Sequence, residues 1–155
     1  MEVGTLEVGS VAPDFTLKNQ HGQSVSLAGL RGRPVALVFY PFAFSGICTG
    51  ELCEIRDNLA VFSDKGVELI AISCDHFFSN RVFADQEGYE FDLLSDFWPH
   101  GAVAKAYGVF DETAGAARRG SFLIDPDGIV RWMVENSIGE ARDFAGYGEA
   151  LANLH

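Results

Sequence analysis

Residues 35–40 read Val-Ala-Leu-Val-Phe-Tyr and are apolar at every position, which constrains the fold more than any other feature of the chain. A strand with one face in water alternates apolar and polar side chains, so this pattern predicts a central strand covered on both faces. Residues 67–73 predict a second buried strand. Between them, residues 46–65 carry apolar side chains at helical spacing and are followed by Gly66. The sequence therefore predicts a parallel strand-helix-strand unit with a right-handed crossover.

The remaining segments are shorter and are separated by turns that contain glycine or proline. We expect hairpins over residues 12–27 and 121–134, a strand over 91–94, and helices over 79–86, 102–107 and 140–154. This element order is that of a thioredoxin-like α/β sandwich, in which helices flank a central mixed sheet that begins with an N-terminal hairpin.

The length and the charge of the chain exclude several classes of protein. The 155 residues contain no repeat or long polar linker, so we expect a single domain over residues 1–155. Acidic side chains outnumber basic ones by 22 to 11, and the net charge of -11 argues against nucleic acid and anionic membrane surfaces as partners. The longest apolar run, 34–44, is about half of the ~20 residues needed to cross a bilayer.

The cysteines and the N-terminus indicate a reducing compartment. Three cysteines cannot all pair within one chain. Residues 1–7 are acidic where a signal peptide is basic, and no apolar stretch follows them. We therefore expect a cytoplasmic protein, in which a thiol is reactive, metal-binding or simply buried rather than part of a permanent disulfide.

Residues 40–53 are the most informative stretch, because they lead from the carboxyl end of a buried strand into a helix. Active sites of open α/β sheets gather at this edge. Cys48 falls near the first helical turn, where unpaired N–H groups and the helix dipole favour a thiolate. A small buried apolar residue is the alternative role for Cys48. Ser45 is placed either to cap the helix or to donate to a thiolate or a bound oxygen.

A metal site is not expected. Cys74, Asp75 and His76 are consecutive potential ligands, but the chain has no second pair at a zinc-type spacing. We expect Cys74 to end a buried strand, and a secondary redox role for it stays open.

The spacing Pro41-x-x-x-Ser45-x-x-Cys48 resembles the active-site motif of the peroxiredoxins, with serine where threonine is commoner. Further segments resemble the same family in the same order, namely residues 12–15, 94–96, 103–109 and 119–125. Residues 97–102 and the surroundings of Cys48 resemble more narrowly the alkyl hydroperoxide reductase E group, which is typical of actinobacteria.

This resemblance implies a thiol-dependent peroxidase that needs neither a metal nor an organic cofactor. The Cys48 thiolate would attack hydrogen peroxide or an organic hydroperoxide and become a sulfenic acid, while water or an alcohol leaves. Arg119 matches the family arginine and, with Ser45 and backbone N–H groups, would hold the oxygens on which charge develops. Pro41 would shield the sulfur from water.

The expected roles of two charged residues near these positions are less specific. Arg118 is expected to be a solvated surface charge, and only the resemblance separates it from Arg119. Glu51 either orients Arg119 or is an ordinary carboxylate on a helix face.

Cys53 lies five residues after Cys48, the spacing at which peroxiredoxin Q proteins carry a resolving cysteine, whereas the best-known reductase E type works with one cysteine. On an ideal helix this spacing separates the Cα atoms by roughly 8.6 Å. A disulfide needs about 4.4–6.8 Å, so resolution requires the first turns to unwind, which Gly46 and Gly50 make easier. The alternatives are that Cys53 is a core residue or that Cys74 resolves.

The resemblance also implies the partners. A disulfide would be reduced by an external thiol, either thioredoxin or a mycoredoxin-mycothiol pair, and the family habit implies a homodimer. Three other functions stay open: a one-cysteine peroxiredoxin resolved by an external thiol, a thiol-disulfide oxidoreductase acting on proteins, and a non-catalytic redox sensor.

Overall fold

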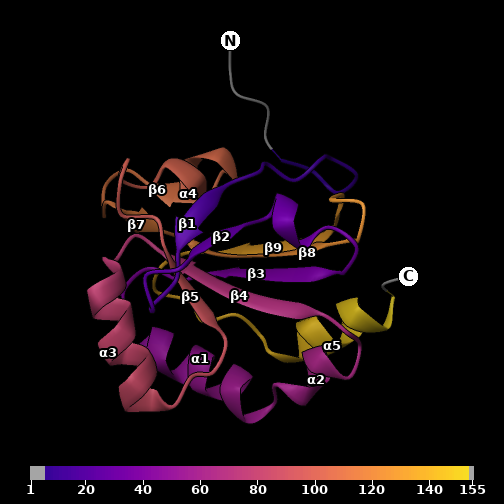
Figure 1. Ribbon diagram of the computed structural model, residues 1–155. Helices are drawn as coiled ribbons and strands as arrows, with labels where there is room; N and C mark the ends of the chain where they lie inside the picture. The colour runs from indigo at the N-terminus through magenta and orange to yellow at the C-terminus, as the bar shows by residue number, and fades with distance from the viewer. Residues whose placement is uncertain (1–5, 154–155) are drawn as a thin grey trace.

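The structure is a computed structural model that describes residues 6–153. Its centre is a seven-stranded mixed sheet in the order β2-β1-β5-β4-β3-β8-β9 (Figure 1). The strands are β1 Thr16–Lys18, β2 Ser24–Ser26, β3 Val35–Phe39, β4 Glu68–Ser73, β5 Asp92–Ser95, β8 Arg119–Ile124 and β9 Val130–Asn136. The helices are η1 Ala28–Leu30, α1 Gly46–Asp57, α2 Ala60–Ser63, α3 Phe77–Glu87, α4 Ala102–Ala106 and α5 Ala145–Ala152. The predicted thioredoxin-like sandwich is confirmed.

The apolar strand β3 lies inside the sheet, as its sequence predicts. All of its residues are buried, and it pairs in parallel with β4 and antiparallel with β8. Strand β4 pairs in parallel with β5 on its other side. Because α1 lies between β3 and β4 in the chain, the predicted parallel strand-helix-strand unit is confirmed.

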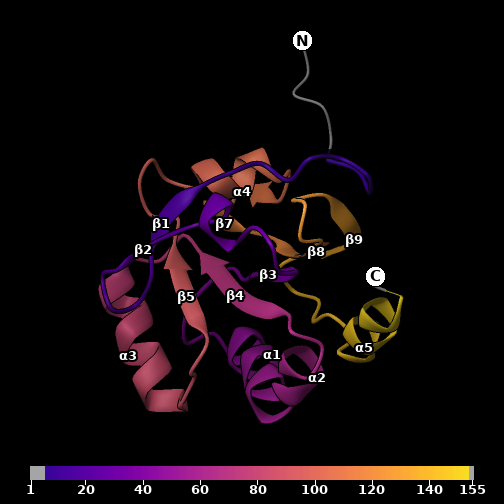
Figure 2. The ribbon, with the colours of Figure 1, turned by 45° about the vertical axis from the view of Figure 1, so that its right-hand side comes forward.

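Two apolar cores cover the two faces of this sheet. Val38 and Tyr40 belong to the core formed with α1, α2, α3 and α5, whereas Leu37 and Phe39 belong to the core formed with α4 and the N-terminal hairpin. Figures 1 and 2 show α1, α2 and α5 on one side of the sheet and α4 on the other. A strand between two dry layers needs apolar side chains in both directions, which explains the lack of alternation.

Three details differ from the sequence-based expectations. The helix expected over residues 46–65 is two helices, because Asn58 leaves helical geometry with φ −124° and its side chain donates to the Glu54 carbonyl. The final helix begins at Ala145 instead of residue 140. A short ribbon of β6 Phe110–Asp111 and β7 Ala116–Ala117 was not expected, since two-residue strands leave no periodic pattern.

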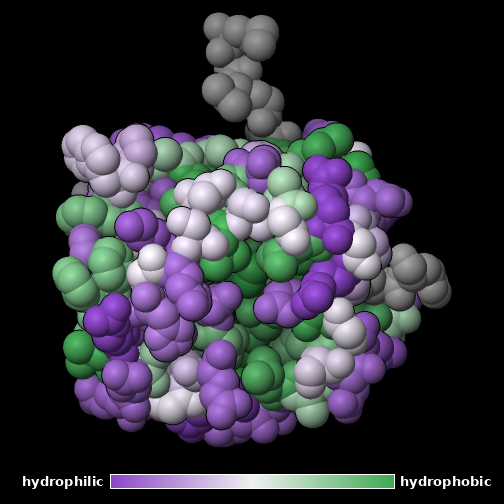
Figure 3. All heavy atoms as spheres, in the orientation of Figure 1, coloured by the Kyte–Doolittle hydropathy of each residue, from purple (hydrophilic) through white to green (hydrophobic). Residues whose placement is uncertain are grey.

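Two expectations concern segments that the structure does not describe in full. Residues 1–5 of the acidic N-terminal segment, and Leu154 at the end of the expected last helix, lie outside them. Across residues 6–153, no helix has both the length and the apolar character needed to span a membrane. The face in Figure 3 carries apolar side chains near its centre and along part of its left edge, with hydrophilic side chains over much of the rest.

Candidate active site

Cys48 lies where β3 passes into α1, in the first turn of the helix. Ser45 is the N-cap residue, and its Oγ accepts a hydrogen bond from the Cys48 N–H at 3.2 Å. Of the two roles expected for Ser45, the structure therefore shows the cap. Cys48 itself is 0% exposed. A molecule from solvent therefore contacts this residue only when neighbouring groups move.

The loop between β3 and Cys48 is held by the segment that follows β4. Pro41 is buried two residues after the end of β3, and the Ala43 N–H donates to Asp75 Oδ2 at 2.8 Å. Phe44 has a φ of 70°, an uncommon conformation for a residue with a side chain, and its ring lies 5.0 Å from that of Phe83. Strained backbone of this kind is typical of functional loops that the surrounding structure holds in place.

Arg119 brings a positive charge from β8 to the sulfur. Its Nη1 lies 3.3 Å from Cys48 Sγ and 2.7 Å from Glu51 Oε1, and its Nε donates to the Ile138 carbonyl at 2.7 Å. The side chain is buried, so these contacts are not shared with bulk water. The geometry brings together Cys48, Ser45, Pro41 and Arg119, the four residues of the motif-based expectation, at one end of the sheet.

Arg118 points away from this site. Its Nε lies 2.7 Å from Glu135 Oε2, and both side chains are more than a third exposed. The expectation that Arg118 is a surface charge agrees with this placement. Successive residues of an extended chain face opposite sides, so only one of two adjacent arginines can reach Cys48.

Glu51 orients Arg119, the more specific of the two roles expected for it. Its carboxylate also accepts from Arg142, at 2.7 Å from the backbone N–H and at 3.0 and 2.8 Å from Nε and Nη2. Burial raises the pKa of Glu51, but the hydrogen bonds and charges of Arg142 and Arg119 outweigh it and lower that pKa. Glu51 is thus a carboxylate that fixes both guanidinium groups.

Arg142 is a site residue that the sequence analysis missed. Its Nη1 donates to the Gly120 carbonyl at 2.9 Å and to Ser121 Oγ at 3.0 Å, which joins the segment before α5 to β8. Arg142 is buried, with only 7% of its surface exposed. No spacing in the sequence marks it, because it lies 91 positions from Glu51.

Cys53 lies on the same helix as Cys48 but faces other residues. Its Sγ is 3.4 Å from Glu87 Oε1 and 3.4 Å from the Tyr89 hydroxyl. All three cysteines are free, and α1 is continuous from Cys48 to Cys53. The structure therefore does not bring these two sulfurs together.

Cys74 is buried just beyond β4. Burial raises the pKa of its thiol to about 12, and the nearby carboxylates of Asp96 and Asp75 add to the shift. A thiol in these surroundings is a poor nucleophile at neutral pH.

The neighbours of Cys74 have structural roles. Asp75 holds Ala43, and His76 caps α3 by accepting from the Phe78 N–H at 3.2 Å. Within residues 6–153, no group of three or more potential ligands is arranged to hold a metal ion.

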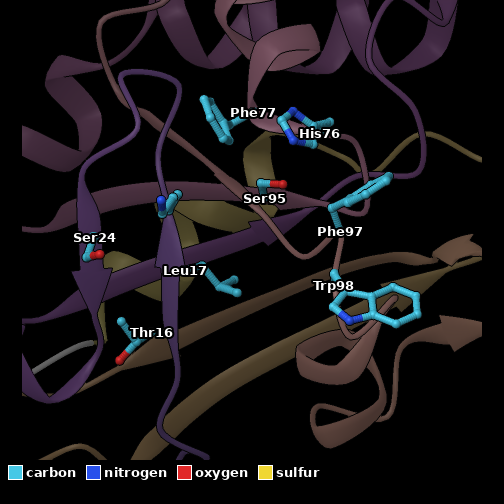
Figure 4. Close-up of a pocket in the computed structure, with 9 residues that line it drawn as sticks. Thr16, Leu17, Ser24, His76, Phe77, Ser95, Phe97 and Trp98 are labelled. Atoms are coloured by element: carbon cyan, nitrogen blue, oxygen red, sulfur yellow. The ribbon is translucent and has the colours of Figure 1, made fainter.

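A separate hollow of about 320 Å³ lies beside the N-terminal hairpin. Figure 4 shows the rings of Phe97 and Trp98 on one side of it and Thr16 and Ser24 on the other. Pro41, Ser45, Cys48 and Arg119 are not among its lining residues. The hollow is therefore not part of the Cys48 site.

Comparisons with known proteins show the family to which the chain belongs. The AhpC/TSA family matches residues 8–133. Alkyl hydroperoxide reductase E of Mycobacterium tuberculosis is 50% identical over 150 residues, which cover 96% of this chain and 98% of the relative. A chloroplastic peroxiredoxin Q of Triticum aestivum is 37% identical over 152 residues, which cover 97% of this chain and 69% of the relative.

Solved structures show the same fold. The crystal structure of peroxidoxin BcpB from Mycobacterium tuberculosis superposes with a TM-score of 0.86 at 29% identity, covering 97% of this chain and 99% of that one. AhpC of Enterococcus faecalis gives a TM-score of 0.88 at 26% identity, covering 96% and 92%.

Proposed function

Because the chain belongs to the AhpC/TSA family of peroxiredoxins and is a thiol-dependent peroxidase, we propose that Cys48 is its peroxidatic cysteine. The Cys48 thiolate attacks the terminal oxygen of hydrogen peroxide or an organic hydroperoxide. The oxygen–oxygen bond breaks, Cys48 becomes a sulfenic acid, and water or an alcohol leaves.

The contact between Arg119 Nη1 and Cys48 Sγ at 3.3 Å is the observation that carries this proposal. A guanidinium group held by Glu51 can stabilise both the anionic sulfur and the departing oxygen without reorganising during the reaction. The N–H groups of the first turn of α1 add further donors, and Ser45 keeps that turn formed. Pro41 contributes no competing N–H.

We propose that Cys53 then resolves the sulfenic acid as an intramolecular disulfide. The intact helix keeps the two Cα atoms roughly 8.6 Å apart, beyond the reach of a disulfide, so the Cys48 turn has to unwind first. Cys53 is half-buried and hydrogen-bonded, whereas Cys74 is buried with its thiol pKa raised to about 12. These surroundings favour Cys53 over Cys74 as the resolving thiol.

A disulfide between Cys48 and Cys53 has to be reduced before the enzyme can react again. We propose that an external dithiol or thiol, of the thioredoxin or mycoredoxin-mycothiol type, returns Cys48 and Cys53 to thiols. Three free cysteines and a reaction that consumes thiols suit the reducing cytoplasm.

We also propose a homodimer. Several large apolar side chains are exposed, and they include Phe42, Phe44 and Ile47 around the start of α1, Phe78 in α3, and Trp98. Trp98 is 81% exposed, which is unusual for tryptophan and typical of an interface. Sedimentation velocity on the purified protein measures the assembly.

Intact mass after one equivalent of peroxide tests the two cysteine roles. We expect wild type to lose two hydrogens, Cys53→Ser to gain one oxygen, and Cys48→Ser to lose peroxidase activity while keeping its fold. A lasting sulfenic acid in wild type would instead support the one-cysteine mechanism. Activity retained in Cys48→Ser would move the nucleophile elsewhere, and a disulfide lost only in Cys74→Ser would make Cys74 the resolving residue.

A further inference from the structure

The thiol of Cys53 is surrounded by groups that the peroxide step does not use. Glu87 Oε1 and the Tyr89 hydroxyl each lie 3.4 Å from Cys53 Sγ. Arg56, on the next turn of α1, is the third charged or titratable group near the sulfur. A carboxylate can only accept a hydrogen bond, so the thiol donates its proton toward Glu87.

The stability of α3 does not account for a carboxylate at this position. Glu87 is the last residue of α3, where the helix dipole disfavours a negative charge, and the last turn contains no basic residue. Arg56 Nη1 donates to the backbone carbonyl of Glu87, which ties the end of α3 to α1. The backbone of Glu87 is thereby fixed next to α1, and its carboxylate lies beside the Cys53 thiol.

Tyr89 connects this group to the helical turn that carries Cys48. Its hydroxyl also lies 3.4 Å from the Thr49 carbonyl, one residue after Cys48. The Tyr89 ring is buried and packs against Phe83 and Phe91 at 5.1 and 5.2 Å. Its position is therefore fixed while the Cys48 turn unwinds, and the hydroxyl released from Thr49 becomes free to donate to Cys53.

We propose that Glu87 is the general base that removes the Cys53 proton when Cys53 attacks the Cys48 sulfenic acid. This inference rests on the resolving role proposed above for Cys53. Glu87 is the group in contact with the reacting sulfur that can accept its proton, and Tyr89 orients the same sulfur.

The Cys53 S–H bond breaks and its proton moves to the Glu87 carboxylate, which leaves a thiolate. The thiolate attacks the sulfenic sulfur, so that the S–S bond forms and the S–O bond breaks. Cys53 sulfur is oxidised by one electron and Cys48 sulfur is reduced by one. The departing hydroxide takes the proton from Glu87 and leaves as water, which restores the carboxylate.

Rapid-quench kinetics on the full chain test this proposal. Wild type, Glu87→Gln and the control Glu54→Gln are mixed with one equivalent of peroxide and quenched in acid, and intact mass follows sulfenic acid and disulfide separately. Glu54 is an exposed carboxylate next to Cys53 in the chain, so its variant removes the same charge without touching the sulfur.

We expect Glu87→Gln to form sulfenic acid at the wild-type rate and the disulfide about 10²-fold more slowly at pH 7, the usual size of a general-base contribution. Its disulfide rate should rise more steeply with pH than that of wild type, because hydroxide then has to remove the proton that Glu87 no longer accepts. Glu54→Gln should behave as wild type. The equal rate of the first step shows that the variant is folded.

Two results would overturn the inference, and they are distinguishable. If wild type forms the disulfide and Glu87→Gln matches Glu54→Gln at every pH, Glu87 is not the base and the role of Cys53 stands. If wild type forms no disulfide, the resolving role of Cys53 fails and the inference fails with it.

Discussion

At the scale of single residues, two adjacent arginines show how little sequence separates a reactive environment from a surface one. Arg119 is buried between Cys48 and Glu51, while Arg118 pairs with Glu135 at the surface. The shape of the guanidinium group determines which contacts Arg119 can make at once. Arg119 Nη1 contacts both Cys48 and Glu51 while Nε donates to the Ile138 carbonyl, and only a rigid planar group with several nitrogens holds all three contacts from one buried position.

Arg119→Lys should slow the reaction of Cys48 with peroxide by about 10²-fold, the effect of losing one oriented donor to a developing negative charge. Lysine keeps the positive charge but lacks the planar guanidinium group, so a slower reaction measures the effect of donor geometry and not of charge. Stopped-flow measurement of the first oxidation provides the rate. Arg118→Lys is the matched control and should stay within about twofold of wild type. Equal rates for all three proteins would remove Arg119 from the reaction.

At the scale of elements, helix α1 has two conflicting tasks. Its first turn has to be formed for Cys48 to react, because the N–H groups and the Ser45 cap exist only in the helix. The same turn has to open for Cys53 to be reached. Gly50, an exposed residue inside α1, lowers the cost of that opening.

Gly50→Ala should therefore slow disulfide formation about fivefold, because alanine stabilises a helix interior by about 1 kcal/mol relative to glycine. A Cβ at Gly50 meets nothing within 4 Å, so the substitution adds no clash. The rate of sulfenic acid formation should not change.

The control for this prediction is Gly148→Ala, at an exposed position of α5 where a Cβ also meets nothing within 4 Å. It should add similar helix stability without affecting the disulfide rate. Both rates come from intact mass at timed intervals. A Gly50→Ala protein that forms the disulfide as fast as wild type would show that the helix does not open at this turn.

At the scale of the whole molecule, carboxylates in separate parts of the fold link stability to pH. Burial raises the pKa of Asp125, but hydrogen bonds from the Ile129 and Asp127 N–H groups and from Arg131 outweigh it, and the pKa is lowered. Glu51 behaves in the same way. Burial instead raises the pKa of Asp96, although two N–H groups of α4 donate to it, so Asp96 acts in the opposite sense.

A carboxyl whose pKa is lowered by folding stabilises the protein above its unfolded value of about 4, and that contribution disappears as pH falls through the folded value. Asp125→Asn should therefore reduce the decline of the urea midpoint between about pH 5 and pH 3. Asp127→Asn, in the same turn, is the control because its exposed side chain accepts none of these hydrogen bonds. Identical pH dependence in both variants would contradict the assignment.

Much of the fold and part of the site follow from local pattern. The unbroken apolar strand predicts β3 in the middle of the sheet, and a serine three residues before Cys48 predicts the start of α1, because burial periodicity and helix capping depend on neighbouring residues. The motif that contains Pro41, Ser45 and Cys48 is readable for the same reason, since it occupies a single strand-to-helix turn.

Tertiary structure alone decided which distant side chains meet. Arg142 reaches Glu51 across 91 positions, and Glu87 reaches Cys53 across 34. A buried guanidinium and a surface one look alike in a sequence, because their burial depends on how β8, α1 and the segment before α5 pack together. The break at Asn58 and the complete burial of Cys48 have the same origin. Periodicity states which face of an element is covered, and only packing determines what covers it.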